Sequence, residues 1–175
     1  MKAGQNCFNW KTKMRFIFVL ILCVFYALPA AGDWQYTRWG MSPDQVMEAS
    51  KGQLKRCDQT CEGQNTKADA ARLFGNYRAG EFSFTTFAMF NKQTNKLSFI
   101  ILELRQKEKG LSLIGSVRAK YGEPSTKNVT AMMSFYVWRD AKDQISIIAI
   151  GLNPSSFDDV SLRYQPRITE SNKGL

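Results

Sequence analysis

The sequence predicts an α+β protein, a single domain in which two helices pack on one face of an antiparallel sheet. The expected order is helix, three strands, helix, three strands, preceded by a signal peptide. Three observations support this prediction. An apolar segment follows a basic one near the N-terminus, two segments carry helix start and stop residues, and short runs rich in β-branched and aromatic residues fill most of the remainder.

The N-terminal segment has the order of a secretory signal. Residues 16–28 are apolar and uncharged, and the segment before them carries no acidic residue and four basic ones, Lys2, Lys11, Lys13 and Arg15. At about 1.5 Å per helical residue, the apolar run covers only roughly 20 Å of a hydrocarbon core about 30 Å thick. A cleaved signal peptide, residues 1–32, is therefore expected.

Small residues after the apolar run predict the cleavage site. Pro29 ends the helix, and Ala30 and Gly32 have the small-x-small spacing that signal peptidase accepts. We expect cleavage between Gly32 and Asp33 and a periplasmic or secreted bacterial protein. The alternative is an uncleaved anchor that keeps residues 16–31 and tethers the chain to a membrane.

The chain beyond Gly32 is long enough for one domain with its own core and too short for two. We expect this domain to span 33–167, with 168–175 as a flexible tail. All 15 acidic residues lie in this part, with all but four of the 24 basic ones, so the mature charge is +5. The basic residues are scattered singly, which is typical of a solvated surface. Lipid headgroups or envelope polymers are conceivable anionic partners.

The first helix carries both of its end signals in the sequence. Ser42 is expected as the N-cap, Pro43 as the first helical residue, Gln45 as the partner in a capping box and Gly52 as the stop. The domain begins directly before this helix. Its first core side chains are expected to be aromatic, namely Trp34, Tyr36 and Trp39.

Residues 51–69 are polar and predict a long exposed loop, which in a compact domain is either functional or mobile. Cys57 and Cys61 lie within it. In an oxidising compartment so close a pair usually forms a disulfide, which contributes at most about 2 kcal/mol. Free thiols are the alternative. A redox pair would need two intervening residues rather than three, and a zinc site is not expected because the chain has no histidine. No cofactor is expected.

Six strands are expected around a second helix. Leu111, Ile114, Val117 and Tyr121 form one stripe of that helix, which ends at Gly122. The third strand is nearly all apolar and is therefore expected to be central. The strands are two within 71–90 on either side of Ala79 and Gly80, one over 97–105, and three at 132–139, 144–152 and 160–166.

The composition excludes several kinds of catalytic site. Without histidine the chain cannot build a Ser-His-Asp or Cys-His arrangement or a histidine general base. Carboxylate catalysis remains conceivable, with Glu81, Glu103, Asp140, Asp143, Asp158 and Asp159 as available acids. Glu103 is the least expected of them, because a charge in an apolar strand must face solvent or find a partner such as Arg105. We assign no catalytic residue.

A nucleic-acid partner is not expected. The aromatic residues of 81–90 lie near two arginines, as in RNA-binding sheets, but they lack the glycine and aromatic order of that motif. Core packing explains them better.

Two short motifs carry a resemblance to a known group. They are "GMSPDQV", which begins at Gly40 and leads into the first helix, and "YGEP", which begins at Tyr121 and closes the second helix. The pattern from Trp34 to Tyr164 resembles small exported bacterial proteins with the α/β module of the outer-membrane assembly lipoproteins and the β-lactamase inhibitor protein. The resemblance implies a binding or scaffolding role in the cell envelope. The chain departs from the lipoproteins because Cys23 follows Leu22 rather than a small residue.

The sequence therefore predicts an exported, non-enzymatic protein that binds another protein or a cell-envelope component, through its sheet or through the loop that holds Cys57 and Cys61. The alternatives are a carboxylate-dependent hydrolase acting on an envelope polymer and a membrane-tethered protein.

Overall fold

The computed structural model describes residues 34–140, 143–151 and 157–167. The predicted signal peptide, the cleavage site between Gly32 and Asp33 and the predicted tail lie outside the described residues. Among the described residues, no helix has the length and apolar character needed to span a bilayer.

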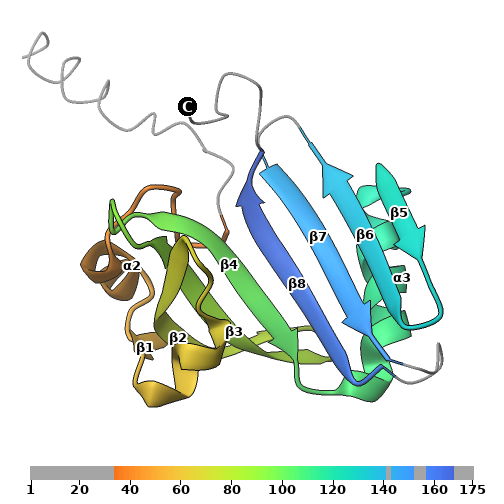
Figure 1. Cartoon of the computed structure of the whole chain (residues 1–175), viewed down its shortest axis with the longest axis horizontal. Helices are drawn as coiled ribbons and strands as arrows, with labels where there is room; N and C mark the ends of the chain where they lie inside the picture. The colour runs from red at the N-terminus through yellow and green to blue at the C-terminus, as the bar shows by residue number, and fades with distance from the viewer. Residues whose placement is uncertain (1–33, 141–142, 152–156, 168–175) are drawn as a thin grey trace, which may run out of the picture. The chain divides into compact units, whose positions relative to one another are not determined.

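The described residues form one antiparallel sheet with two helices. The helical segments are α2 (Pro43–Ala49), η2 (Gln59–Gln64), η3 (Lys107–Lys109) and α3 (Gly110–Tyr121). The strands are β1 (Leu54–Arg56), β2 (Asp69–Ala79), β3 (Phe82–Asn91), β4 (Leu97–Leu104), β5 (Thr126–Val129), β6 (Met133–Arg139), β7 (Asp143–Ile150) and β8 (Asp159–Pro166). Figure 1 shows the resulting sheet in the order β1-β2-β3-β4-β8-β7-β6-β5. The predicted α+β class is therefore confirmed.

The chain builds this sheet in two similar halves, α2 with β1–β4 and α3 with β5–β8. The halves meet where β4 pairs with β8, with Ile100 opposite Tyr164 and Leu102 opposite Leu162. The prediction of three strands after each helix differs from the structure, in which each helix is followed by four strands. The additional strands, β1 and β5, are short and mostly polar and lack the apolar alternation by which strands are recognised.

Both helices pack on the same face of the sheet. Val46 of α2 and Leu113, Ile114 and Val117 of α3 belong to one buried cluster with side chains of β3, β4, β7 and β8. The predicted stripe of α3 is wrong at two positions, since Leu111 and Tyr121 are exposed, whereas Leu113 is buried. The hydrophobic effect therefore holds both helices against one face.

The ends of the helices follow the residues that were predicted to cap them, with one difference. Ser42 accepts a hydrogen bond from the Gln45 backbone, and the Gln45 side chain returns one to Ser42. At the other end α2 stops at Ala49, before Gly52, which adopts a φ of 82° in the following turn. Gly122 ends α3 as expected, with a φ of 78° that favours glycine.

A second, smaller cluster lies on the sheet face opposite the helices. Its buried members come from β2, β3, β4 and η2, and they are Cys61, Ala71, Phe87, Met89 and Phe99. The segment between β1 and β2 therefore covers this face of the first half.

Candidate functional site

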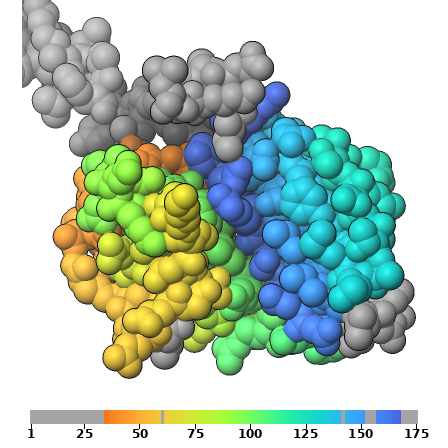
Figure 2. Space-filling model, in the orientation of Figure 1, coloured from red at the N-terminus to blue at the C-terminus, as the bar shows by residue number. Residues whose placement is uncertain are grey.

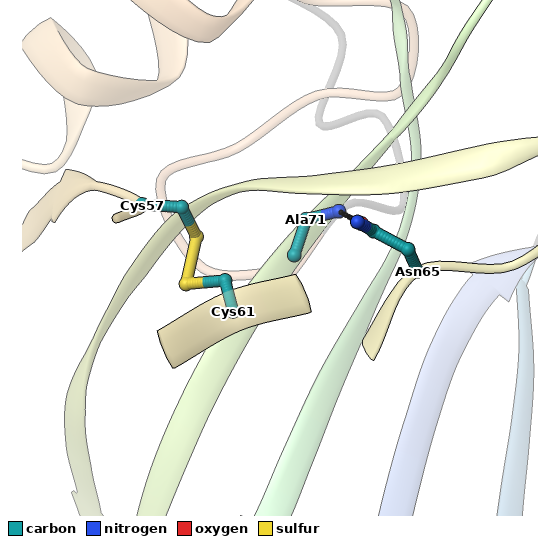
Figure 3. The surroundings of a disulfide bond; sticks show 4 residues. All are labelled: Cys57, Cys61, Asn65 and Ala71. Carbon is teal, nitrogen blue, oxygen red and sulfur yellow. Dashed lines mark hydrogen bonds between the residues drawn. A yellow bond between two sulfur atoms is a disulfide. The ribbon is translucent and has the colours of Figure 1, made fainter. Parts of the chain in front are cut away.

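The loop that connects β1 and β2 is built onto the sheet. Cys57 continues the ladder of β1, because its backbone N–H donates to the Arg72 carbonyl at 2.9 Å. Four residues on, Cys61 lies in η2 and is only 2% exposed, packed over Phe87, Met89 and Phe99. The two sulfur atoms lie at bonding distance, 2.19 Å, and the Cα atoms are 5.7 Å apart. Figure 3 shows this disulfide. We call residues 57–68 the disulfide loop.

Three polar contacts fix the far end of the disulfide loop. The Ala71 backbone N–H donates to the Asn65 side-chain oxygen at 3.0 Å, a bond drawn in Figure 3. The Thr66 backbone N–H donates to the Asp69 carbonyl at 2.9 Å. The Gln64 side chain donates to the carboxylate of Glu103 on β4. The predicted exposed loop is therefore half right, because the segment is polar outside but anchored underneath.

An open pocket of about 710 Å³ lies beside the disulfide loop. This volume is within the range of ligand sites, but the surface is open and mostly polar. Its charged residues have both signs, Arg56, Arg72 and Lys92 with Asp58 and Glu62, and both cysteines also line it. We call this surface the loop pocket.

The basic residues of the loop pocket have different partners. Arg56 pairs with Asp44 at 2.5 Å, and both side chains are largely exposed. The Lys92 ammonium donates to the Thr66 carbonyl at 2.5 Å. The Arg72 side chain is exposed and makes no hydrogen bond or ion pair with the described residues. Arg72 is thus the cation most available to a partner.

Glu103 does not pair with Arg105. It lies on the sheet face that carries the disulfide loop, half-buried, between Thr85 of β3 and Ser161 of β8. Burial raises the pKa of the Glu103 carboxyl, while the hydrogen bond from Gln64 opposes this shift. The residue therefore anchors the loop rather than facing a cavity.

Three of the other acids named from the sequence, Asp140, Asp143 and Glu81, have polar partners. Asp140 accepts a hydrogen bond from the Asp143 backbone at 2.7 Å, and Asp143 accepts one from the Trp39 indole at 2.9 Å. Asp140 and Asp143 line a cavity of about 100 Å³, small against typical ligand sites. Glu81 pairs with Lys109 at 2.8 Å. Within the described ranges no group of three or more acidic or cysteine residues could hold a metal ion.

The sequence did not single out one basic residue, Arg163, on the sheet face opposite the helices. The Arg163 guanidinium stacks on the Phe99 ring, 3.6 Å from its centroid, and thereby joins β8 to the smaller cluster. Burial lowers the pKa of Arg163. The alternation of β8 could have revealed it, since Arg163 falls between Leu162 and Tyr164, which pack on the helix side.

Comparisons with known proteins add no assignment. A scan against protein-family models, a search of curated proteins and a search of solved structures each found no match.

Proposed function

We propose that this protein is exported by a bacterial cell, loses its signal peptide between Gly32 and Asp33, and binds another protein or an envelope component without catalysing a reaction. The observation that carries the proposal is the disulfide loop. Its inner side is anchored on the sheet by Cys61, Gln64 and Asn65, while its outer side opens into the loop pocket.

An anchored loop suits a binding surface for a physical reason. A partner that binds a pre-ordered loop does not have to lose as much conformational entropy as one that orders a mobile loop. The mixed charges of the loop pocket match a polar partner surface better than an apolar ligand. Arg72 would be the first residue to contact an acidic group of that partner.

Export is supported by the cysteine pair and by the N-terminal pattern. Cysteines at bonding distance fit a compartment in which disulfides persist. The resemblance to exported envelope proteins implies the same location. Catalysis is disfavoured because Asp140, Asp143 and Glu103 already accept hydrogen bonds that organise turns and the disulfide loop.

The binding proposal can be tested by crosslinking in the intact cell. A photoreactive amino acid at Arg72 should give a discrete adduct, and the same amino acid at Ser112 should not, because Ser112 is exposed on α3 at the other face. Replacing Cys57 and Cys61 by serine should reduce the adduct. No adduct from Arg72, or equal adducts from both positions, would contradict the proposal.

Export is tested separately by intact mass and N-terminal sequencing of fractionated cells. A species that begins at Asp33, with both thiols unreactive until reduced, is the expected result. A full-length species in the membrane fraction would contradict cleavage and would support the anchor.

A further inference from the structure

The outer edge of the second half of the sheet is formed by β5 and is exposed. Among the described strands, β5 ends the sheet opposite β1, as Figure 1 shows. All four of its residues are exposed. In an antiparallel edge strand, alternate residues direct their N–H and C=O groups away from the sheet, where another strand can pair with them.

The opposite edge is protected by its charged residues and by a neighbouring helix. β1 has three residues, of which Lys55 and Arg56 are exposed and charged, and it lies beside α2. Arg56 is further held by its ion pair with Asp44 of α2. Short length, charge and a covering helix are the usual means by which edges avoid pairing.

Exposed apolar side chains gather at the same corner as β5. Of the six large hydrophobic side chains that are exposed among the described residues, four lie there: Val129 (52%), Met132 (60%), Met133 (39%) and Ile150 (45%). Met133 and Ile150 are cross-strand neighbours on the face away from the helices, and Val129 lies beside Ser134 on the helix side, so both faces of this corner carry exposed apolar side chains. Such clustering of exposed apolar residues marks interaction sites.

A small cavity beside β5 could accept one apolar side chain. It has a volume of about 150 Å³ and is lined by Val129, Met133 and Phe157, with Ser134 and Gly151 at its side. The neighbouring turn is already paired, since Thr130 donates to the Met133 carbonyl at 2.8 Å and Gly151 to that of Met132 at 3.0 Å. The outer groups of β5 are therefore the ones left for a partner.

The charge of this hairpin decides between possible partners. Residues 125–139 contain no acid and two cations, Lys127 and Arg139. The Arg139 guanidinium donates to the Ser125 and Thr126 hydroxyls, each at 3.2 Å, so it lies at the start of β5. If a second copy of this chain paired with β5, its Lys127 and Arg139 would approach the same cations of the first copy and repel them. An acidic strand would find opposite charge.

We infer that β5 binds an extended, acidic segment of a partner protein by strand addition, as an extra strand of the sheet. Lys127 and Val129 are two residues apart and share one face of β5. The partner strand places an acidic side chain against Lys127 and, two residues away, an apolar side chain in the cavity beside Val129. This surface is separate from the loop pocket and does not depend on it.

The inference is tested on the mature protein with a labelled peptide. The peptide has threonine at every second position, and the positions between are alternately glutamate and valine. It should bind in fluorescence anisotropy and slow hydrogen exchange at the outward-facing amides of β5. The matched peptide, with lysine in place of glutamate, should bind at least about two- to fivefold more weakly. Equal binding of both peptides, or no binding of either, would overturn the inference.

Variants locate the binding on β5. Val129→Ser should weaken binding of the glutamate peptide about tenfold, as expected for an exposed valine that the bound peptide buries. Leu111→Ser is the matched control, because Leu111 is equally exposed (52%) but lies on α3, and it should have no effect. Lys127→Glu should reverse the preference between the two peptides. An equal loss of peptide affinity in both serine variants would overturn the inference. So would a dimer, seen by sedimentation velocity, in which the β5 amides are protected from hydrogen exchange without peptide.

Discussion

The two halves of the sheet share one order of elements but differ in how their outer surfaces are covered. In the first half, residues 57–68 connect β1 to β2, lie across the sheet face and bury Cys61. At the equivalent place in the second half, residues 130–132 connect β5 to β6 by a short turn. The first half therefore displays an anchored loop, whereas the second leaves its edge strand open.

Because of this difference, the two candidate binding surfaces offer a partner different kinds of contact. The loop pocket offers side chains of both charges around a covered sheet face. The β5 edge offers backbone groups and apolar side chains. Figure 2 shows the two regions on opposite flanks of the molecule, the yellow loop segment on the left and the cyan β5–β6 segment on the right.

The largest expected effect comes from Gly75, at which β1 approaches β2. A Cβ atom there would lie 2.3 Å from the Gln53 carbonyl oxygen and 2.9 Å from a Leu54 methyl group. Because a backbone atom cannot rotate away, Gly75→Ala should shift β1 and lower the free energy of unfolding by about 2 to 3 kcal/mol. Urea denaturation measures the loss.

Two other glycines provide the comparison for Gly75. Gly110→Ala would bring a Cβ atom within 2.5 Å of Phe157 and 2.9 Å of Val160, side-chain atoms that can partly adjust, so the loss should be smaller. Gly115→Ala meets nothing within 4 Å and should stabilise α3 by about 0.5 to 1 kcal/mol. A smaller loss for Gly75→Ala than for Gly110→Ala would contradict the rigid contact of β1.

Removing the disulfide should make the first half resemble the second. Replacing Cys57 and Cys61 by serine should lower the free energy of unfolding by about 2 kcal/mol, the value expected for a loop this short. Hydrogen exchange should accelerate in 54–65, where the contacts of Cys61 are weakened, and stay unchanged at Ile147 of β7. Wild-type protein in reductant should behave in the same way. Uniform acceleration across both halves would show that the loop supports the whole fold.

The helix starts provide a smaller contrast between the halves. Ser42→Ala removes the capping box of α2 and should lower the free energy of unfolding by about 1 kcal/mol. In α3 the N-cap is Lys109, whose side chain makes no capping hydrogen bond. Lys109→Ala should therefore have less effect, since it removes an ion pair with the Glu81 carboxylate and a hydrogen bond to the Glu81 carbonyl, both at the surface. Equal losses in thermal unfolding would contradict this difference.

Strong local signals made much of the fold predictable. The capping residues around Ser42 and Gly122 and the apolar runs of β3, β4 and β7 each specify their own structure. β1 and β5 escaped because each has only three or four residues with a single apolar side chain, and so short a segment forms a strand only when a neighbouring strand pairs with it.

The candidate surfaces were less predictable than the elements that form them. The close spacing of Cys57 and Cys61 indicated their pairing, but nothing local indicates that Cys61 packs on Phe99 or that Gln64 reaches Glu103. These contacts join residues far apart in the chain. The open edge at β5 likewise depends on the strand order, which one sequence does not show.

The smallest expected effect concerns Glu103, where the loop of the first half meets β4. Its carboxyl has a raised pKa, so the protonated form stabilises the fold below the ordinary value of 4.5, and this contribution is lost as the pH rises through the raised pKa. Glu103→Gln should therefore increase the free energy of unfolding at pH 7, by less than about 1 kcal/mol because the side chain is only half-buried. The increase should disappear below about pH 4.

The pH dependence separates burial from the hydrogen bond that anchors the loop. Glutamine can still accept the hydrogen bond from Gln64, so the variant changes the charge and keeps the contact. Glu81→Gln is the control, because it removes only an exposed ion pair and should not stabilise the protein. If Glu103→Gln destabilises the protein at pH 7, then the charged hydrogen bond outweighs the cost of burial, and the disulfide loop is held on the sheet by a carboxylate as well as by Cys61.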